Sequence, residues 1–476
     1  MAIRLSDAAC LLPPSTRADS RFGFDTHSAR LIELVAKADI GSLDPAAINA
    51  LRIFLADTLA VGIAGKCNPA ADGVLAAMQA VGGAGHVGCL GRPDIALPAH
   101  QAAVINGFQI HCLEWDGLHE PSVVIALCAT IAALHADLAS SDATYGDLLL
   151  AFAVGVETAV FFGSAAATAP RFFRPSAAGT MGAAMAVGKL RGYDREQLHN
   201  VLGLAYSQVG GTMQAHWEGS EALALQVGFA ARAALTAADL VAHGITGPHE
   251  VVSGKFGYFT LIEQPEDLDG ALAQWGSPWK ITEMAHKPFP AGRATQAVLT
   301  ALLELRAERD FDAEDVALVR AEVPSLIGLL VSRPWSPKMS PAYARLCLEY
   351  IVARMLLDRT IDPVRFTDAF IGEDDVAALA QRIECVVDDN PDPNALGPQT
   401  VTVTLKDGTK MQRFVDAPLG APGHPLSAAQ RIDKIARCFA AGGWKGDPAQ
   451  FMAAFESAPL DQKARELVLA QTGGSA

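Results

Sequence analysis

The chain has 476 residues, of which 50% are apolar and only 19% are charged. An average soluble domain has roughly 25% charged residues, and so much apolar surface excludes an intrinsically disordered chain. Lysine and arginine number 37 against 52 aspartate and glutamate residues, which gives a formal net charge of −15. Because nucleic-acid binding needs a basic face, this charge argues against a nucleic-acid partner, whereas a small anionic substrate needs only a few local cations.

The sequence contains no run of about 18 uninterrupted apolar residues, the length that a membrane-spanning helix needs. The best candidates are residues 123–136, which are too short, and residues 148–169, which Glu157 interrupts. The first 20 residues lack the apolar region of a signal peptide, and residues 1–25 are expected to form an irregular leader. We therefore expect a protein without a membrane partner.

The eight cysteines are far apart in the sequence and form no CxxC pair. In a chain of this length, such spacing predicts reduced and mostly buried thiols in a cytoplasmic protein. It also argues against a zinc ribbon or an iron–sulfur cluster, whose ligands are clustered in sequence.

Helical periodicity dominates the first half of the chain. Between residue 28 and about residue 243, apolar residues recur at helical spacing, as Leu51, Leu55 and Leu59 do. The character changes near Trp275, after which prolines interrupt the pattern. Further helices are predicted at residues 294–309, 345–357 and 426–441, and strands at residues 316–323, 382–387, 400–405 and 411–415, the last two joined by a hairpin turn at residues 406–409.

These elements predict a mainly α protein in three parts. A large all-helical domain spans residues 26–283, and a smaller α+β lid domain spans residues 284–418. The chain then returns to the helical domain over residues 419–476, so the lid domain is inserted before the C-terminal helices.

Residues 83–88 match the pattern G-x-G-x-x-G of dinucleotide-binding proteins. That fingerprint requires a strand before it and a helix that begins within it. Here a helical pattern precedes the glycines, and Pro93 prevents a helix after them. We therefore predict a loop at residues 83–88, and no cofactor is demanded by the sequence.

Residues 106–122 concentrate titratable side chains in a chain that is otherwise poor in charge. The segment contains His111, Glu114, Asp116, His119 and Glu120. Crowded acids and imidazoles push their pKa values apart, which acid–base catalysis exploits. If the helix runs that far, His111 and Glu114 share one face, and the turn at Pro121 projects His119 into a cleft. The alternative is a structural helix end, at which the histidines satisfy carbonyl groups.

Two further segments hold candidate anion-binding residues. Residues 286–296 place Lys287 and Arg293 around two prolines, so two cations are held close together and suit a substrate carboxylate. The alternative is a domain-crossover loop whose cations pair with acids. Arg174 precedes Pro175 at an apparent helix start, which favours an anion site, although a solvated arginine is the more common situation.

These three segments, in this order, resemble the MmgE/PrpD family of 2-methylcitrate dehydratase, iminodisuccinate epimerase and cis-aconitate decarboxylase. The likeness extends from about residue 28 to residue 441 and includes residues 55–61, 146–157 and 406–408. It implies a helical domain and an α+β lid with the active site between them. It also implies a homodimer that uses neither cofactor nor metal.

The resemblance implies roles for particular residues. Glu114 and Asp116 match the acidic run of the family, His119 matches the histidine that follows it, and Lys287 matches the lysine of its Lys-Pro-x-Pro segment, so these four are implied to be catalytic. Arg174, Arg293 and His111 are implied to bind substrate.

Two positions depart from the family pattern. Arg174 stands where the family has a histidine, and Leu223 stands where it has a lysine. The departures remove one imidazole and one cation. His216, Trp217 and Glu218 lie close by in the sequence and are candidates to replace them.

The leading hypothesis is a cofactor-independent lyase of the dehydratase type that acts on a small hydroxy-di- or tricarboxylate. A base removes the proton alpha to a carboxylate, His119 protonates the leaving hydroxyl, and the cations hold the carboxylates. The alternatives are an epimerase or isomerase of a dicarboxylate, a decarboxylase of the cis-aconitate type, and a binding protein without activity. The residues alone do not divide the roles of base and acid among Glu114, Asp116, His111 and His119.

Overall fold

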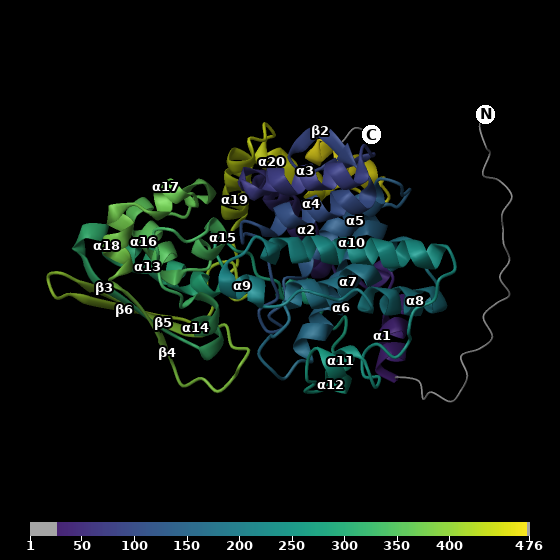
Figure 1. Cartoon of the computed structure of the whole chain (residues 1–476), viewed down its shortest axis with the longest axis horizontal. Helices are drawn as coiled ribbons and strands as arrows, with labels where there is room; N and C mark the ends of the chain where they lie inside the picture. The colour runs from purple at the N-terminus through teal and green to yellow at the C-terminus, as the bar shows by residue number, and fades with distance from the viewer. Residues whose placement is uncertain (1–25, 474–476) are drawn as a thin grey trace.

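The computed structural model describes residues 26–473, so the leader predicted for residues 1–25 lies outside the described part. Figure 1 shows two bodies side by side along the long axis, a larger helical one and a smaller one that contains a four-stranded sheet. The prediction of a mainly α protein with a small α+β domain is confirmed. The seven described cysteines are free, and five of them are buried.

The helical domain begins at Thr26 and includes most of the first half of the chain. Its helices are α1 (Thr26–Lys37), α2 (Pro45–Ala64), α3 (Ala70–Gly82), α4 (Ala99–His111), α5 (Ala126–Leu138), α6 (Tyr145–Ser164), α7 (Arg174–Leu190), α8 (Arg195–Tyr206), α9 (Gln214–Glu218), α10 (Ala222–Ala242), α11 (Tyr258–Leu261) and α12 (Leu268–Ala273). Helix starts follow ordinary capping chemistry. Asp44 accepts a hydrogen bond from the backbone N–H of Ala47, and Thr144 and Asp147 form a reciprocal capping box at the start of α6.

Two glycines allow α4 and α10 to cross at very short range. A Cβ atom on Gly228 would lie 2.4 Å from the carbonyl oxygen of Val104, and one on Gly107 would lie 2.8 Å from the Cα atom of Gly228. Any larger residue would push the helices apart, because protein interiors have no spare volume. This crossing fixes α4, whose last residue is His111.

Three helices are long and apolar enough to cross a membrane by length and composition, although the sequence contains no uninterrupted apolar run of about 18 residues. They span Pro45–Cys67, Tyr145–Ser164 and Ala222–Ala242. In the fold, between 61% and 89% of the apolar window of each helix is buried inside the protein. Packing within the core therefore accounts for their composition, and Glu157 in the middle of α6 is buried with its carboxylate bonded to the backbone N–H groups of Gly276 and Lys280.

In a dinucleotide-binding fold the glycine loop leads from a strand into a helix, and residues 83–97 do not have this order. Helix α3 ends at Gly82, and the chain then forms the antiparallel pair β1 (Val87–Cys89) and β2 (Arg92–Leu97). No helix begins within the glycine pattern, so it is not a dinucleotide fingerprint, but the predicted loop at residues 83–88 is shorter than expected because Val87 and Gly88 belong to β1. The prediction of an all-helical domain misses this short hairpin, because two or three paired residues leave no clear alternation in the sequence.

The α+β domain is built on a four-stranded sheet with its own apolar core. The strands are β3 (Val316–Val323), β4 (Ile383–Val387), β5 (Gln399–Leu405) and β6 (Lys410–Val415), in the spatial order β4-β3-β5-β6. β3 pairs with β4 in parallel and with β5 antiparallel, with Val319 opposite Val403. The hairpin turn predicted at residues 406–409 joins β5 to β6, and Gly408 there has a φ of 88°.

Helices pack on this sheet, as Figure 1 shows for α13 and α16. They are α13 (Gln296–Glu308), α14 (Ser325–Val331), α15 (Pro341–Ala344), α16 (Leu348–Asp358), α17 (Asp368–Ile371) and α18 (Asp374–Ala380). The inward residues Val401 and Val403 of β5 are fully buried, and they belong to an apolar cluster that runs from Phe289 to Val415.

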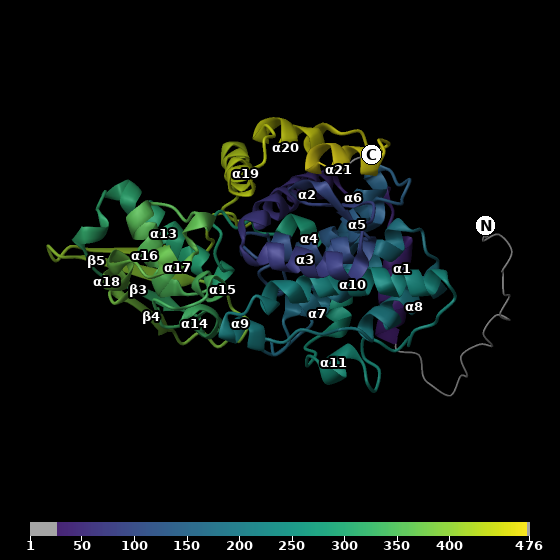
Figure 2. The ribbon, with the colours of Figure 1, turned by 45° about the horizontal axis from the view of Figure 1, so that its top comes forward.

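The chain then returns to the helical domain, as Figure 2 shows for the helices at its top. These helices are α19 (Ala428–Gly442), α20 (Pro448–Ser457) and α21 (Ala464–Thr472). Lys434 of α19 forms a buried ion pair with Asp57 of α2 at 2.8 Å and donates to the carbonyl oxygen of Trp115 at 3.0 Å. The returning segment therefore braces the loop that follows α4.

Candidate active site

The loop after α4 turns back on itself. The helix ends at His111, so it does not run far enough for His111 and Glu114 to share one helix face. Glu114 has a φ of 54°, in the left-handed region that non-glycine residues rarely occupy. This turn brings the Oε1 atom of Glu114 to 3.4 Å from the Nε2 atom of His111. Strain of this kind persists only where the surroundings hold it, and it is common at functional sites.

A two-residue bridge places Lys287 against this loop. Leu118 and Ala285 exchange backbone hydrogen bonds at 3.0 and 2.8 Å, and His286 donates its N–H to the carbonyl oxygen of Gly420 at 2.8 Å. The indole N–H of Trp115 donates to the carbonyl oxygen of Pro288 at 3.2 Å. The segment that crosses into the α+β domain is therefore fixed to the loop after α4 on both sides of Lys287.

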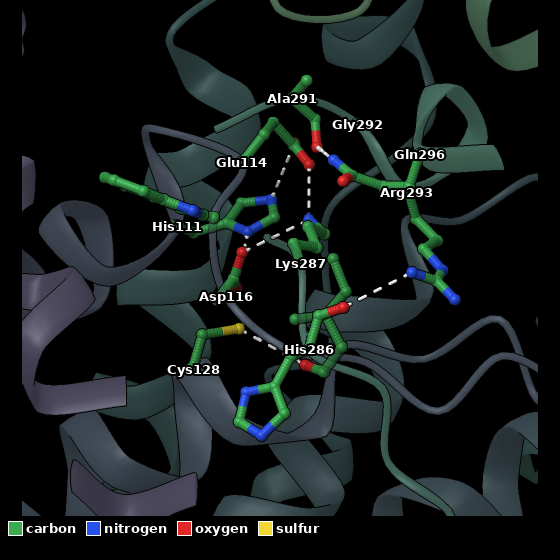
Figure 3. A network of polar contacts seen from close by, with 12 residues as sticks. His111, Glu114, Asp116, Cys128, His286, Lys287, Ala291, Gly292, Arg293 and Gln296 are labelled. Atoms are coloured by element: carbon green, nitrogen blue, oxygen red, sulfur yellow. Dashed lines mark hydrogen bonds and ion pairs between the residues drawn. The ribbon is translucent and has the colours of Figure 1, made fainter. Parts of the chain in front are cut away.

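Four buried ionisable side chains meet at this point, and we call them the buried quartet: His111, Glu114, Asp116 and Lys287. The Nζ atom of Lys287 lies 2.9 Å from Glu114 Oε2 and 3.5 Å from Asp116 Oδ1 (Figure 3). The Nδ1 atom of His111 lies 2.9 Å from Asp116 Oδ2. Each carboxylate therefore touches both cationic groups, which compensates the cost of burying them.

The four groups of the quartet shift one another's pKa values. Burial would raise the pKa of Asp116, but His111 and Lys287 outweigh it and lower this pKa to about 2. Burial opposes ionisation of Glu114 as well, yet Lys287 and His111 lower its pKa. Burial also disfavours the charged forms of His111 and Lys287, but the two carboxylates raise both pKa values. Each of the four groups is therefore stabilised in its charged form by the groups of opposite charge beside it.

A cavity of about 630 Å³, measured out to its open mouth, adjoins the quartet between the two domains. Ligand-binding sites commonly lie at such an interface between two domains. Of the residues singled out from the sequence, the cavity is lined by Glu114, Lys287, Arg174, Arg293 and His216. Apolar side chains such as Phe173, Met213 and Leu330 complete the wall. His111 and Asp116 are not among its lining residues, and they hold Glu114 and Lys287 in place.

The two arginines in the cavity wall already have partners. Arg174 donates from Nε to Glu263 Oε1 at 2.8 Å and from Nη1 to Asn394 Oδ1 at 3.0 Å, so it also links the two domains. Arg293 donates from Nε to Glu120 Oε1 at 2.7 Å. A carboxylate therefore neutralises each guanidinium, and neither arginine is a free anion site of the kind that the sequence predicted.

His119 does not line the cavity. The turn predicted at Pro121 does form, since His119 and Val124 exchange backbone hydrogen bonds. However, the ring is directed elsewhere, because Nδ1 lies 2.9 Å from Ser122 Oγ and Nε2 lies 3.0 Å from Glu283 Oε2. The projection of His119 into the cleft is therefore wrong for this structure.

The structure adds two buried arginines of the α+β domain that no motif indicated. Arg333 donates to the backbone oxygen and to Nδ1 of His216, both at 3.1 Å. Arg345 is only 1% exposed, and its Nε and Nη1 atoms have no hydrogen-bond partner among residues 26–473. Neither guanidinium forms an ion pair with any acid in the described part of the chain.

Arg345 borders a second, smaller cavity on another side of Glu114. The lining of this cavity includes His111, Glu114, Leu223 and Arg345. The cation that the family pattern places at residue 223 is absent, but Arg345 brings a buried positive charge to the same cavity. The guanidinium carbon of Arg345 also lies 4.7 Å from the ring centre of Phe366, which holds it by a cation–π contact.

Metal binding fits this site poorly. His111, Asp116 and Cys128 lie close enough together to share an ion. However, Lys287 already contacts the carboxylate of Asp116, and burial raises the pKa of the Cys128 thiol well above its usual value. A coordinating thiol must lose its proton, so this set of side chains is poorly suited to hold a metal ion.

Two domains that meet at a cavity with a strained loop, paired acids and bases and buried cations define an enzyme. Residues 29–271 match the model of the MmgE/PrpD N-terminal domain, and residues 289–447 match that of the MmgE/PrpD C-terminal domain. The chain belongs to the MmgE/PrpD family and is an enzyme of the lyase or dehydratase type.

Known relatives agree with this classification. The chain is 31% identical to human cis-aconitate decarboxylase over 361 residues, which covers 72% of this chain and 73% of the relative. It is 29% identical to the mouse cis-aconitate decarboxylase over 366 residues, with 72% of each chain covered. It is also 25% identical to the cis-aconitate decarboxylase-like protein oryM of Aspergillus oryzae, over 83% of this chain and 86% of that protein.

Proposed function

We propose that this enzyme acts on a small di- or tricarboxylate by proton transfer at the carbon alpha to a carboxylate, with loss of water as the leading reaction. Arg345 carries the argument, because it is buried in the smaller cavity with Glu114, forms no ion pair within residues 26–473, and leaves its Nε and Nη1 atoms without a hydrogen-bond partner there. An uncompensated buried charge is costly. A substrate carboxylate would supply the missing partner of Arg345.

The geometry favours Glu114 as the base. It is the carboxylate of the buried quartet that lines both cavities, whereas Asp116 lines neither. The lowered pKa of Glu114 makes it a weak base in the free enzyme. A substrate carboxylate nearby would raise this pKa by charge repulsion, which suits a general base that acts only on bound substrate.

Lys287 would stabilise the product of that step. Removal of the alpha proton pushes electrons onto a carboxylate oxygen, and an ammonium group preorganised in a buried site favours the charge that develops there. Asp116 and His111 would hold Lys287 and Glu114 at the required spacing. The roles of Arg174 and Arg293 would then be to shape the cavity wall and join it to Glu263 and Glu120.

Decarboxylation is the second candidate, and the names of the relatives support it. Both reactions need bound carboxylates and a proton transfer, and the same residues could serve either. Arg174 and Leu223 depart from the family pattern, which supports a substrate or a pose that differs from that of the relatives. A cytoplasmic location is part of this proposal, since it follows from the dispersed cysteines.

A product assay separates the candidates. The purified enzyme is incubated with a panel of hydroxy-di- and tricarboxylates and of unsaturated tricarboxylates, and the mixtures are followed by proton NMR. Loss of water gives new alkene signals, and loss of CO₂ gives a product one carbon shorter. Inversion without either loss would indicate an epimerase. An enzyme that neither converts nor binds any member of the panel would contradict the proposal.

A further inference from the structure

His216 occupies a defined place in the wall of the larger cavity. It belongs to the short helix α9, is 6% exposed, and lines the cavity together with Glu114 and Lys287. The helix is anchored to the α+β domain, because Ser340 Oγ donates to the carbonyl oxygen of Gly219 at 2.6 Å. The imidazole is therefore held rigidly beside the buried quartet.

Arg333 determines which nitrogen of this ring carries the proton. Its Nη2 atom lies 3.1 Å from Nδ1 of His216, and its Nη1 atom donates to the backbone oxygen of the same residue at 3.1 Å. A guanidinium has donors only, so Nδ1 must accept. In the neutral ring the proton is then on Nε2, and no group among the described residues forms a hydrogen bond with that atom.

Several contacts fix Arg333 itself. Its Nη2 atom also donates to the carbonyl oxygen of Leu330 at 3.0 Å, and its guanidinium carbon lies 4.8 Å from the ring centre of Tyr343. The arginine therefore presents a stable fork to His216, and a guanidinium loses little entropy when it binds in this way.

The surrounding charges keep the imidazole neutral. Burial is the largest effect, and the positive charges of Arg333 and His111 add to it, while Glu114 acts in the opposite direction. Together they lower the pKa of His216 to about 4. A neutral imidazole donates a hydrogen bond without giving up its proton readily, and some enzymes use one as an electrophile at an oxygen that gains charge.

We infer that His216 is a catalytic residue whose Nε2–H group donates to the substrate carboxylate oxygen on which negative charge accumulates, and that Arg333 is its positioning residue. This inference rests on the proposed function. When the C–H bond alpha to the carboxylate breaks, the proton passes to Glu114 and the electron pair moves toward that oxygen. Lys287 and His216 would then stabilise the resulting dianion from two directions.

Substitutions at His216 test the catalytic part. His216→Leu removes the donor and should lower kcat by about a hundred-fold, the usual effect of losing one such donor, with a small change in KM. His216→Gln keeps an N–H donor and should restore part of kcat. The matched control is His243→Leu, an exposed histidine after α10, which should leave kcat unchanged. Full activity in folded His216→Leu would overturn the inference while the proposed function stands.

Nitrogen-15 NMR tests the tautomer without any need for turnover. In protein labelled on histidine nitrogen, the signals of His216 are those absent from the spectrum of His216→Gln. We expect a neutral ring protonated at Nε2 at pH 7, and a higher pKa of this ring in Arg333→Gln. A ring that is charged at pH 7, or protonated at Nδ1, would overturn the inference whether or not the enzyme turns over the panel. A wild-type enzyme that neither converts nor binds any member of the panel would overturn the proposed function, and the catalytic role of His216 with it.

Discussion

Lys287 and Glu114 are 173 positions apart in the chain, yet their side chains form a 2.9 Å ion pair that is almost completely buried. The pair joins the crossover into the α+β domain to the strained loop after α4. Neither charge could be buried there alone, because an isolated ion in the protein interior is far too costly. The ion pair is therefore a structural device as well as the centre of the proposed chemistry.

Lys287→Met should affect both stability and activity. The change preserves most of the volume but leaves Glu114 and Asp116 without their ammonium partner, and breaking a buried pair in this way costs about 3–5 kcal/mol. Urea unfolding should show this loss. The kcat/KM value should also fall by at least about ten- to a hundred-fold, because one charge-assisted contact contributes about 1.5–3 kcal/mol. A variant with the stability and activity of the wild type would contradict the placement of Lys287.

Glu157 provides a test by pH. Burial raises the pKa of this carboxyl to about 7, although the backbone N–H groups of Lys280 and Gly276 favour its charged form. Since the folded state holds its proton more tightly than the unfolded state, Glu157 reduces stability as the pH rises from about 4.5 to about 7.

Glu157→Gln removes this titration and keeps an acceptor for the N–H groups. We expect the free energy of unfolding of the variant to exceed that of the wild type by up to about 3 kcal/mol at pH 8 and to be similar at pH 4.5. Denaturant melts at the two pH values measure the difference. An equal effect at both pH values would show that Glu157 does not titrate in this range.

Glycine substitutions test the crossing of α4 and α10. Gly228→Ala would place a methyl group 2.4 Å from the carbonyl oxygen of Val104, and overpacking of this kind costs about 1–3 kcal/mol or more. Gly73 in α3 is the matched control, because a Cβ atom there meets nothing within 4 Å. Gly73→Ala should raise the melting temperature, since alanine favours a helix by about 1 kcal/mol over glycine. The two changes should therefore have opposite signs in thermal melts.

We also propose that the protein is a homodimer. Phe229 and Leu240 of α10 are exposed apolar side chains, and Trp217 of α9 is 63% exposed. Closed two-fold dimers are the most common way to cover such surface. Multi-angle light scattering at micromolar concentration should return about twice 49.9 kDa. A mass of one chain would refute the dimer.

Local sequence patterns predicted the elements of the α+β domain well. The alternation in β3 and β5 and the Lys406-Asp407-Gly408 turn depend on neighbours in sequence, and the strands and hairpin lie where these patterns placed them. The end of α4 was not predictable in this way. Glu114 adopts a left-handed conformation without being glycine, and the ion pair with Lys287 that accompanies this turn comes from a distant segment.

In the candidate site, too, local patterns predicted some features, whereas others depend on contacts between distant segments. Crowding of titratable groups in residues 106–122 identified three members of the buried quartet, and the lysine directly before Pro288 identified the fourth. The direction of His119 depends on Glu283, and the tautomer of His216 depends on Arg333, which is 117 positions away. Such pairings arise from the tertiary fold and leave no signal in a single sequence.

The central claim is that Glu114 removes a proton alpha to a substrate carboxylate. The most direct measurement is incorporation of solvent deuterium at that carbon, followed by proton NMR in D₂O with the carboxylate that the wild-type enzyme converts. The account predicts deuterium incorporation, product formation or both with wild-type enzyme, and a loss of at least about a hundred-fold in Glu114→Gln, since proton transfer by a positioned group contributes 10²–10⁴-fold, roughly. A folded Glu114→Gln variant that exchanges deuterium and turns over as fast as the wild type would contradict it.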